Sequence, residues 1–290
     1  MEHPYRLPRL LAVDLDGTLL TPDKRIGAAD TAALRRAVDA GIAILVATGR
    51  GLHSARPVLE ELPVPAHAAL HNGALMLDPA GAELWRVAMR PRPVAAALPL
   101  VRAAGLHPML YAGVPGAGGG DVTLVLERQA RESPHTQDYL RTKGPILELV
   151  ADVATACDRG VLGIVSFGPR ESVVAAATAV GRLDGDVESW WSTATAPGAH
   201  LFEALAPGAA KGRALRRLTE RLGFTPEEVM AIGDNNNDLD MLRYAGTAVA
   251  MANATPEARA AAHFVTTANT ANGVAHALGR VGLPTRLRHG

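Results

Sequence analysis

Two carboxylates, Asp14 and Asp16, directly follow a short apolar run at residues 10–13. The run has the length and composition of a buried strand. Two acids beside an apolar core repel each other and lose hydration, so a cation, a proton or hydrogen-bond donors must compensate them. Gly17 permits a tight turn after them, and Thr18 adds a hydroxyl. The alternative is an acidic turn that caps the next segment, because short motifs also occur by chance.

A second polar cluster, Thr48-Gly49-Arg50, follows the apolar run at residues 42–47. Its hydroxyl, its unobstructed backbone N–H and its planar guanidinium suit a phosphate group. The alternative is an ordinary strand-to-helix turn in which Thr48 is the cap.

Lys211 begins a segment that is expected to be helical to about residue 222. The N-terminus of a helix favours anions, so a lysine there is reasonable if it faces a phosphate or a carboxylate. The alternative is a solvated surface lysine.

Asp234 and Asp238 follow the apolar run at residues 229–232 and enclose three asparagines, the last of which is Asn237. These side chains form an oxygen-rich set of the kind that Mg²⁺ prefers. A helix–loop–helix calcium site fits less well, because its glycine and its terminal glutamate are missing. The segment therefore predicts a Mg²⁺ site.

The elements that must position these groups indicate an α/β fold. A helix at residues 27–40 lies between the two apolar runs, and strand–helix–strand predicts a parallel, doubly wound, Rossmann-like sheet. Residues 88–193 alternate strands and helices without an acid cluster, which indicates an inserted α+β cap domain that selects the substrate. The expected core is then residues 1–87 and 194–290, with a strand at residues 201–205 in its second part.

Composition limits the class of partner. The chain has 290 residues, enough for two domains, and its 29 Lys and Arg balance its 29 Asp and Glu. Zero formal charge gives no reason to expect a nucleic-acid or membrane partner. The only cysteine, Cys157, cannot form an intramolecular disulfide, and no signal peptide or continuous apolar span is evident. We expect a cytoplasmic protein, monomeric or dimeric, that acts on a small molecule.

Together these clusters, in this order, resemble the four motifs of the haloacid dehalogenase-like (HAD) phosphohydrolases. The Cof-type branch of that family carries a cap between its second and third motifs, and its Asn-Gly-Ala is similar to residues 72–74. The approach to its motif lysine is similar to residues 203–212. Its Met-Gly-Asn-Ala resembles residues 251–254, where Ala252 departs from the glycine.

The resemblance implies a Mg²⁺-dependent phosphatase acting on a small, soluble phosphomonoester. Asp14 would attack phosphorus and form an aspartyl-phosphate, and Asp16 would protonate the leaving alcohol and then activate water. The implied metal ligands are Asp14, the Asp16 backbone carbonyl, Asp234 and Asp238. The implied phosphate-binding residues are Thr48, Gly49, Arg50, Lys211 and Asn237.

Three other functions use similar residues. A phosphomutase with the same site would return the phosphoryl group to a sugar. A receiver-type signalling domain pairs an acid cluster with Thr and Lys, but it is shorter and lacks the second acid. A non-catalytic binding protein for phosphorylated metabolites is the third alternative, which the loss of a motif residue would favour.

Overall fold

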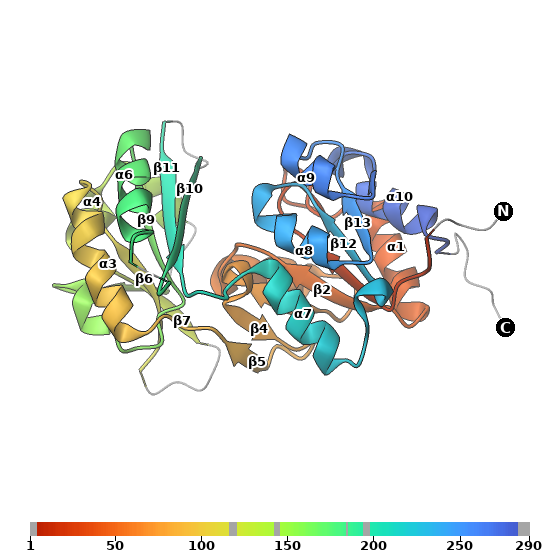
Figure 1. The fold of residues 1–290 in the computed structure, drawn as a ribbon, viewed down its shortest axis with the longest axis horizontal. Helices are drawn as coiled ribbons and strands as arrows, with labels where there is room; N and C mark the ends of the chain where they lie inside the picture. Colours follow the sequence, from red (N-terminus) through yellow and green to blue (C-terminus); the bar gives the residue numbers. More distant parts are fainter. Residues whose placement is uncertain (1–4, 116–120, 142–145, 184, 194–197, 284–290) are drawn as a thin grey trace. The chain divides into compact units, whose positions relative to one another are not determined.

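The computed structural model describes residues 5–115, 121–141, 146–183, 185–193 and 198–283. The chain divides into two compact units. The first comprises Met1–Arg50, Pro57–Leu84 and Ala210–Gly290, and the second comprises Gly51–Arg56 and Trp85–Ala209. Figure 1 shows each unit built around its own sheet.

The first unit contains an eight-stranded sheet in the order β14-β13-β12-β1-β2-β3-β4-β5. Its strands are β1 (Leu10–Val13), β2 (Ala43–Ala47), β3 (His67–Leu70), β4 (Leu75–Leu77), β5 (Glu83–Arg86), β12 (Val229–Gly233), β13 (Thr247–Ala250) and β14 (Phe264–Val265). The pairs from β14 to β3 are parallel, and β4 is antiparallel to β3. The predicted parallel-sheet α/β core is confirmed.

Apolar residues make β1 and β12 the centre of this sheet. Every residue of both strands is buried, which is the pattern of parallel strands covered on both faces. The helices of the chain's first and last parts are α1 (Ala28–Asp39), α2 (Leu52–Glu61), α7 (Lys211–Arg221), α8 (Leu239–Tyr244), α9 (Pro256–Ala261) and α10 (Gly273–Arg280). Helix α1 packs against α10, and α7 packs against α8.

The direction of the winding reverses between β1 and β12. From β1 the chain continues to β2 and β3 on one side, and it later places β12, β13 and β14 on the other side. In open α/β sheets, ligands bind at the carboxyl ends of the strands at such a switch point. The loops after β1, β2 and β12 are therefore where the site is expected.

The second unit contains a six-stranded sheet in the order β10-β11-β9-β6-β7-β8. Its strands are β6 (Met109–Gly113), β7 (Val122–Leu126), β8 (Leu147–Leu149), β9 (Gly163–Gly168), β10 (Glu188–Thr193) and β11 (His200–Leu205). Its helices are α3 (Pro91–Ala103), α4 (Arg128–Glu132), α5 (Gln137–Arg141) and α6 (Arg170–Val180). All strand pairs are antiparallel except β7 with β8, and buried residues of α3 and α6 share an apolar core with the sheet. This is an α+β unit.

The strand predicted at residues 201–205 forms, but it does not belong to the first unit's sheet. As β11 it pairs with β9 and β10, and Phe202 and Ala204 lie in the second unit's core. The expectation was wrong because an apolar pattern identifies a strand but not its partners. The predicted domain end after residue 193 adjoins residues 194–197, which lie outside the described residues.

Candidate active site

Three carboxylates meet at the switch point. Asp14 follows β1, Asp234 follows β12, and Asp238 ends the short 3₁₀ turn after Asp234. One carboxylate oxygen from each lies within 4.8 Å of the others. Asp14 is 5% exposed and Asp238 is fully buried, so these charges are largely removed from water. The sequence-predicted acids Asp14, Asp234 and Asp238 are thus brought together.

A buried lysine lies between two of these acids. The Lys211 ammonium donates to Asp14 Oδ1 and to Asp238 Oδ1, both at 2.6 Å. Lys211 is the first residue of α7 and is only 1% exposed, which excludes a solvated surface lysine. Burial lowers its pKa, but the Coulombic attraction of Asp14 and Asp238 outweighs burial, and the net shift is upward. The two carboxylates therefore favour the charged form of Lys211.

The cluster carries more negative charge than Lys211 neutralises. Burial raises the pKa of Asp14; Lys211 lowers it, and Asp238 and Asp234 add to the increase, so the net pKa lies well above the usual value. Burial raises the pKa of Asp234 to about 6, assisted by Asp238 and opposed by the hydrogen bond from Thr18. When all are ionised, three carboxylates and one ammonium carry a net negative charge, which a further cation would compensate. The all-oxygen donor set fits a hard divalent ion such as Mg²⁺.

Asp16 lies outside this three-acid cluster. Its carboxylate accepts hydrogen bonds from Arg50 Nε at 2.6 Å and Arg50 Nη2 at 2.7 Å, and from Lys24 Nζ at 2.8 Å. Burial raises the pKa of Asp16, but hydrogen bonds from Arg50 and Lys24 outweigh burial and lower the pKa to about 2. In this arrangement Asp16 is ionised, whereas the resemblance implied an acid that holds a proton.

In the loop after β1, contacts with Asp234 account for the glycine at position 17 and the threonine at position 18. Gly17 has φ +86°, and a Cβ there would collide with the Asp234 carboxylate. The Thr18 hydroxyl donates to Asp234 Oδ1 at 2.8 Å. From a third loop, the Asn253 amide donates to the Gly17 carbonyl at 2.8 Å. Thr18 and Asn253 therefore hold the β1 loop in place. Neither role is evident from the sequence alone.

The loop after β2 carries the predicted phosphate-binding residues. Thr48 is 1% exposed, and its hydroxyl accepts from the Arg50 N–H at 3.1 Å, as a turn cap would. A hydroxyl that accepts can still donate its proton. The Gly49 backbone packs against Asn72, whose Oδ1 would lie 3.1 Å from a Cβ at Gly49. The Arg50 guanidinium is paired with Asp16, so its availability to a phosphate depends on that pair.

Asn237 faces the turn between β3 and β4, which packs against the loop after β2. Its amide Nδ2 donates to Asn72 Oδ1 at 3.0 Å. The turn that carries Asn237 is held by Asp238 Oδ2, which accepts from the N–H groups of Asp234 and Asn235 at 2.9 and 3.0 Å. Asp238 thus uses one oxygen to build the loop and the other to bind Lys211.

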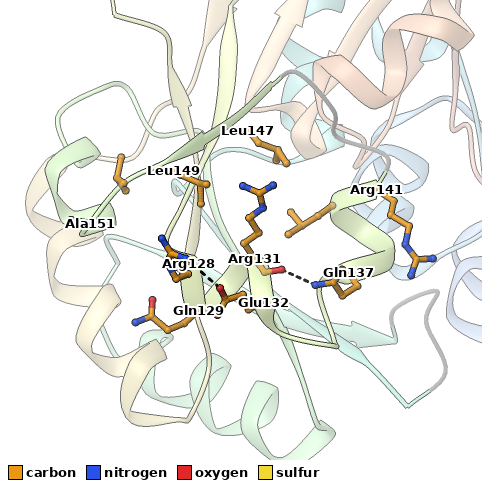
Figure 2. Close-up of a pocket in the computed structure, with 11 residues that line it drawn as sticks. Arg128, Gln129, Arg131, Glu132, Gln137, Arg141, Leu147, Leu149 and Ala151 are labelled. Carbon is orange, nitrogen blue, oxygen red and sulfur yellow. Dashed lines mark hydrogen bonds and ion pairs between the residues drawn. The ribbon is translucent and has the colours of Figure 1, made fainter.

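A cavity of about 780 Å³ lies in the second unit, among α4, α5 and β8. Figure 2 shows Arg128, Arg131 and Arg141 among the residues that line this cavity, together with Leu147 and Leu149 of β8. Arg128 pairs with Glu132 at 3.7 Å, and Gln137 donates to the Arg131 carbonyl at 2.8 Å. Its lining contains one carboxylate and no residue of the acid cluster, so the chemistry lies elsewhere.

No helix in the described part of the chain is long and apolar enough to cross a membrane.

Comparison with known proteins finds one family over nearly the whole chain. A family model described as haloacid dehalogenase-like hydrolase matches residues 11–278. The chain is 30% identical over 278 residues to pyridoxal phosphate phosphatase YbhA of Escherichia coli, covering 92% of this chain and 96% of that protein. It is 28% identical over 281 residues to 5-amino-6-(5-phospho-D-ribitylamino)uracil phosphatase YwtE of Bacillus subtilis, covering 92% and 96%.

Solved structures share the fold. A haloacid dehalogenase-like hydrolase from Bacteroides thetaiotaomicron superimposes with a TM-score of 0.79 at 26% identity. The match covers 96% of this chain and 99% of that one, so both units are included.

Proposed function

The chain belongs to the haloacid dehalogenase-like hydrolase family, in its Cof-type branch, and hydrolyses phosphomonoesters; from this premise we propose that Asp14 is its nucleophile. The observation that carries the proposal is the buried Asp14 carboxylate at the switch point, 2.6 Å from the Lys211 ammonium. A buried carboxylate cannot remain ionised without such compensation. Lys211 lowers the pKa of Asp14, and the proposed Mg²⁺ would supply the further positive charge that the ionised, attacking form requires.

In the proposed reaction, an oxygen of Asp14 attacks phosphorus and the bond from phosphorus to the substrate alcohol breaks. Asp16 gives its proton to the departing alkoxide, which leaves an aspartyl-phosphate. Asp16 then takes a proton from water, the water oxygen attacks phosphorus, and Asp14 is released with inorganic phosphate. The two acids thus have separate tasks.

Loss of the Arg50 hydrogen bonds would favour the protonated form of Asp16, to which Lys24 also donates. The Arg50 guanidinium donates two hydrogen bonds to the Asp16 carboxylate, and it can donate the same pair to the dianionic phosphate of a substrate. We propose that an incoming phosphate takes Arg50 from Asp16, which raises the pKa of Asp16 and prepares it as an acid. Free enzyme and substrate complex then differ at this ion pair.

The proposed phosphate site collects donors from three loops. Thr48 supplies a hydroxyl, Gly49 a backbone N–H, Arg50 and Lys211 positive charge, and Asn237 an amide N–H. Phosphoryl transfer depends on such donors because charge spreads over the non-bridging oxygens in the transition state. Two contacts support this assignment: Lys211 lies 2.6 Å from Asp14, and Asn237 donates to Asn72, whose amide packs against Gly49.

Mg²⁺ is the proposed cofactor, with Asp14, the Asp16 backbone carbonyl, Asp234 and Asp238 as its ligands. When bound, it supplies positive charge that reduces the repulsion between the carboxylates and the phosphate. The excess of acid over ammonium in the cluster supports this proposal.

The proposed substrate is a small, soluble phosphomonoester. The names of two relatives give pyridoxal phosphate and a phosphoribitylamino uracil as their substrates, and both are small metabolites. Balanced charge is consistent with such a substrate, since a nucleic-acid enzyme is expected to carry a basic face. The part of the second unit that lies between β5 and α7 in the chain is proposed to choose among such substrates, because the acid cluster lies wholly in the first unit.

The test measures phosphate release from 4-nitrophenyl phosphate with Mg²⁺ and after exhaustive chelation. We expect chelation and Asp14→Asn each to abolish turnover, whereas Asp39→Asn, an exposed acid on α1, should leave turnover unchanged. Asp16→Asn should still form phosphoenzyme from this good leaving group.

Undiminished turnover without metal would contradict the proposed cofactor, and a covalent label on any residue but Asp14 would contradict the proposed nucleophile. Isomerisation of a sugar phosphate without phosphate release would identify a mutase instead.

A further inference from the structure

The turn between β3 and β4 has an unusual backbone. Three consecutive residues, His71, Asn72 and Gly73, have φ angles of +48°, +52° and +95°. This left-handed region is unfavourable for residues with a Cβ, although asparagine tolerates it better than most. Such conformations persist where the surrounding structure holds them, and they cluster at functional sites. Contacts with the surrounding structure must therefore hold this turn.

The turn is fastened to the proposed phosphate loop after β2. The His71 N–H donates to the Arg50 carbonyl at 2.9 Å, and the Asn72 N–H donates to the Thr48 carbonyl at 3.0 Å. The Asn72 amide oxygen also packs against Gly49, where a Cβ would lie only 3.1 Å from it. Asn72 and the adjacent His71 thus contact all three residues of this loop, with Asn72 at Thr48 and Gly49 and His71 at Arg50.

The side chain of Asn72 also reaches the loop after β12. Its Oδ1 accepts from Asn237 Nδ2 at 3.0 Å, and Asn72 is 5% exposed, so water competes little for this bond. Strands β2 and β12 lie on either side of β1 in the sheet. The bond between the two asparagines therefore links the loop after β12 to the turn between β3 and β4, which is itself hydrogen-bonded to the loop after β2.

We propose that Asn72 is a positioning residue, which orients the Asn237 amide for phosphate binding. An amide has a donor end and an acceptor end. With Asn72 Oδ1 as its partner, Asn237 keeps its NH₂ group toward the turn between β3 and β4, beside the β2 loop, and retains a second N–H for a phosphate oxygen. Without that partner the amide can rotate and present its own oxygen, which repels an anion. This inference rests on the proposed function.

The chain offers a matched control for the backbone. Asn272, before α10, has φ +56° and is no part of the acid cluster. Replacing either asparagine with glycine keeps the left-handed backbone accessible and removes the side chain. A difference between Asn72→Gly and Asn272→Gly therefore reports on the amide rather than on backbone strain.

The experiment is a double-mutant cycle on Asn72→Gly and Asn237→Ala in the full chain, read with 4-nitrophenyl phosphate and with inorganic phosphate as inhibitor. We expect Asn72→Gly to lower kcat/KM about tenfold and to weaken phosphate inhibition similarly, the effect of one hydrogen bond. The double variant should match Asn237→Ala alone. Asn272→Gly should behave as the wild type.

A second variant keeps the test decisive if Asn72→Gly does not fold. Asn72→Asp retains an accepting oxygen and the tolerance for positive φ, so Asn237→Ala should still lower kcat/KM in that background. Additive losses in the first cycle, or no effect of Asn237→Ala beside Asn72→Asp, would overturn the inference. Inactive wild type and Asn272→Gly would contradict the proposed function itself, whereas full activity in Asn72→Gly contradicts only the role of Asn72.

Discussion

At the scale of residues, two of the lysine–aspartate contacts among the described residues differ greatly in burial. Lys211 meets Asp14 with side chains 1% and 7% exposed, and Lys24 meets Asp16 with side chains 60% and 40% exposed. Removing one partner of a buried pair leaves an uncompensated charge, while an exposed pair contributes little because water replaces the partner. The two pairs therefore form a natural comparison.

We predict that Lys211→Met lowers the metal-free free energy of unfolding by about 3 kcal/mol, whereas Lys24→Met lowers it by less than about 1 kcal/mol. Urea unfolding of both variants in chelator measures this difference. Added Mg²⁺ should stabilise Lys211→Met more than it stabilises the wild type, because an extra cation replaces the missing ammonium. Equal losses in the two variants would contradict the electrostatic role of Lys211.

Asp234 gives a pH-dependent prediction. Its pKa in the folded chain is raised to about 6 by burial and by Asp238, whereas an unfolded chain titrates aspartate near 3.9. Between these values the folded chain holds a proton that the unfolded chain has released, so folding stability falls as pH rises. In chelator, the wild type should lose stability relative to Asp234→Asn as pH rises from about 4 to about 6.5.

Urea unfolding across that range, with and without Mg²⁺, measures the effect. Metal binding favours the ionised carboxylate, so Mg²⁺ should remove the decline. Parallel pH curves for wild type and Asp234→Asn in chelator would show that Asp234 is not the titrating group.

At the scale of elements, the site depends on how closely α7 approaches α8. A Cβ at Gly212 would lie 2.5 to 2.7 Å from backbone atoms of Asp240 and Met241, which cannot move without shifting α8. The Gly212 N–H also donates to Asp240 Oδ2 at 2.8 Å. Gly212 therefore sets where α7 begins, and with it the position of the neighbouring Lys211 ammonium.

We predict that Gly212→Ala destabilises the chain by about 1–3 kcal/mol, the usual result of overpacking, and lowers phosphatase activity. The control is Gly279→Ala in α10, where nothing lies within 4 Å of an added Cβ. That change should raise stability by about 0.5–1 kcal/mol through helix propensity. Thermal unfolding and turnover of the two variants test this, and equal effects in both would contradict the close approach.

The elements that bear the site were predictable because their signals are local. An apolar run that stops at polar residues marks β1, β2 and β12, and parallel pairing then brings Asp14, Thr48 and Asp234 to one edge of the sheet. The pairing of Asp16 was not predictable in this way. Lys24 reaches Asp16 only because the chain folds back between Leu20 and Ile26, and apolar periodicity carries no signal for that turn.

Asn72 shows a second limit of the sequence. Asn-Gly predicts a turn, and a 3₁₀ turn is present at these residues. Its bond to Asn237 joins residues 165 positions apart. A turn signal in the sequence predicts only the local backbone. It does not predict which distant side chain binds to the turn, so this contact is seen only in the structure.

At the scale of the whole molecule, the pairing of β11 determines where the chain can be cut to remove the second unit from the first. We predict that replacing residues 88–206 with a linker of about ten Gly and Ser residues leaves a folded, monomeric first unit. Replacing only residues 88–193 keeps β11 but removes β9 and β10, its partners on both edges. The exposed strand, which carries Leu201, Phe202 and Leu205, should then cause aggregation.

Size-exclusion chromatography and circular dichroism of the two deletions test this prediction. Equal solubility would show that β11 does not need its sheet. If the second unit selects small substrates, the longer deletion should also lower kcat/KM for the best small ester and tolerate larger esters relatively better.

The pairing of Leu10 with Val229 has a consequence for biosynthesis. On one edge of β1, the neighbouring strand is β12, which is synthesised roughly 200 residues later. At usual translation rates this is a delay of about 10–45 s. During that interval the nascent chain exposes an edge that can recruit other chains. The second unit contains the partners of its own strands and can fold while the ribosome is still at work. The acid cluster, by contrast, forms only after Asp234 and Asp238 have emerged, so a ribosome that stalls before them leaves a nascent chain with Asp14 and no site around it.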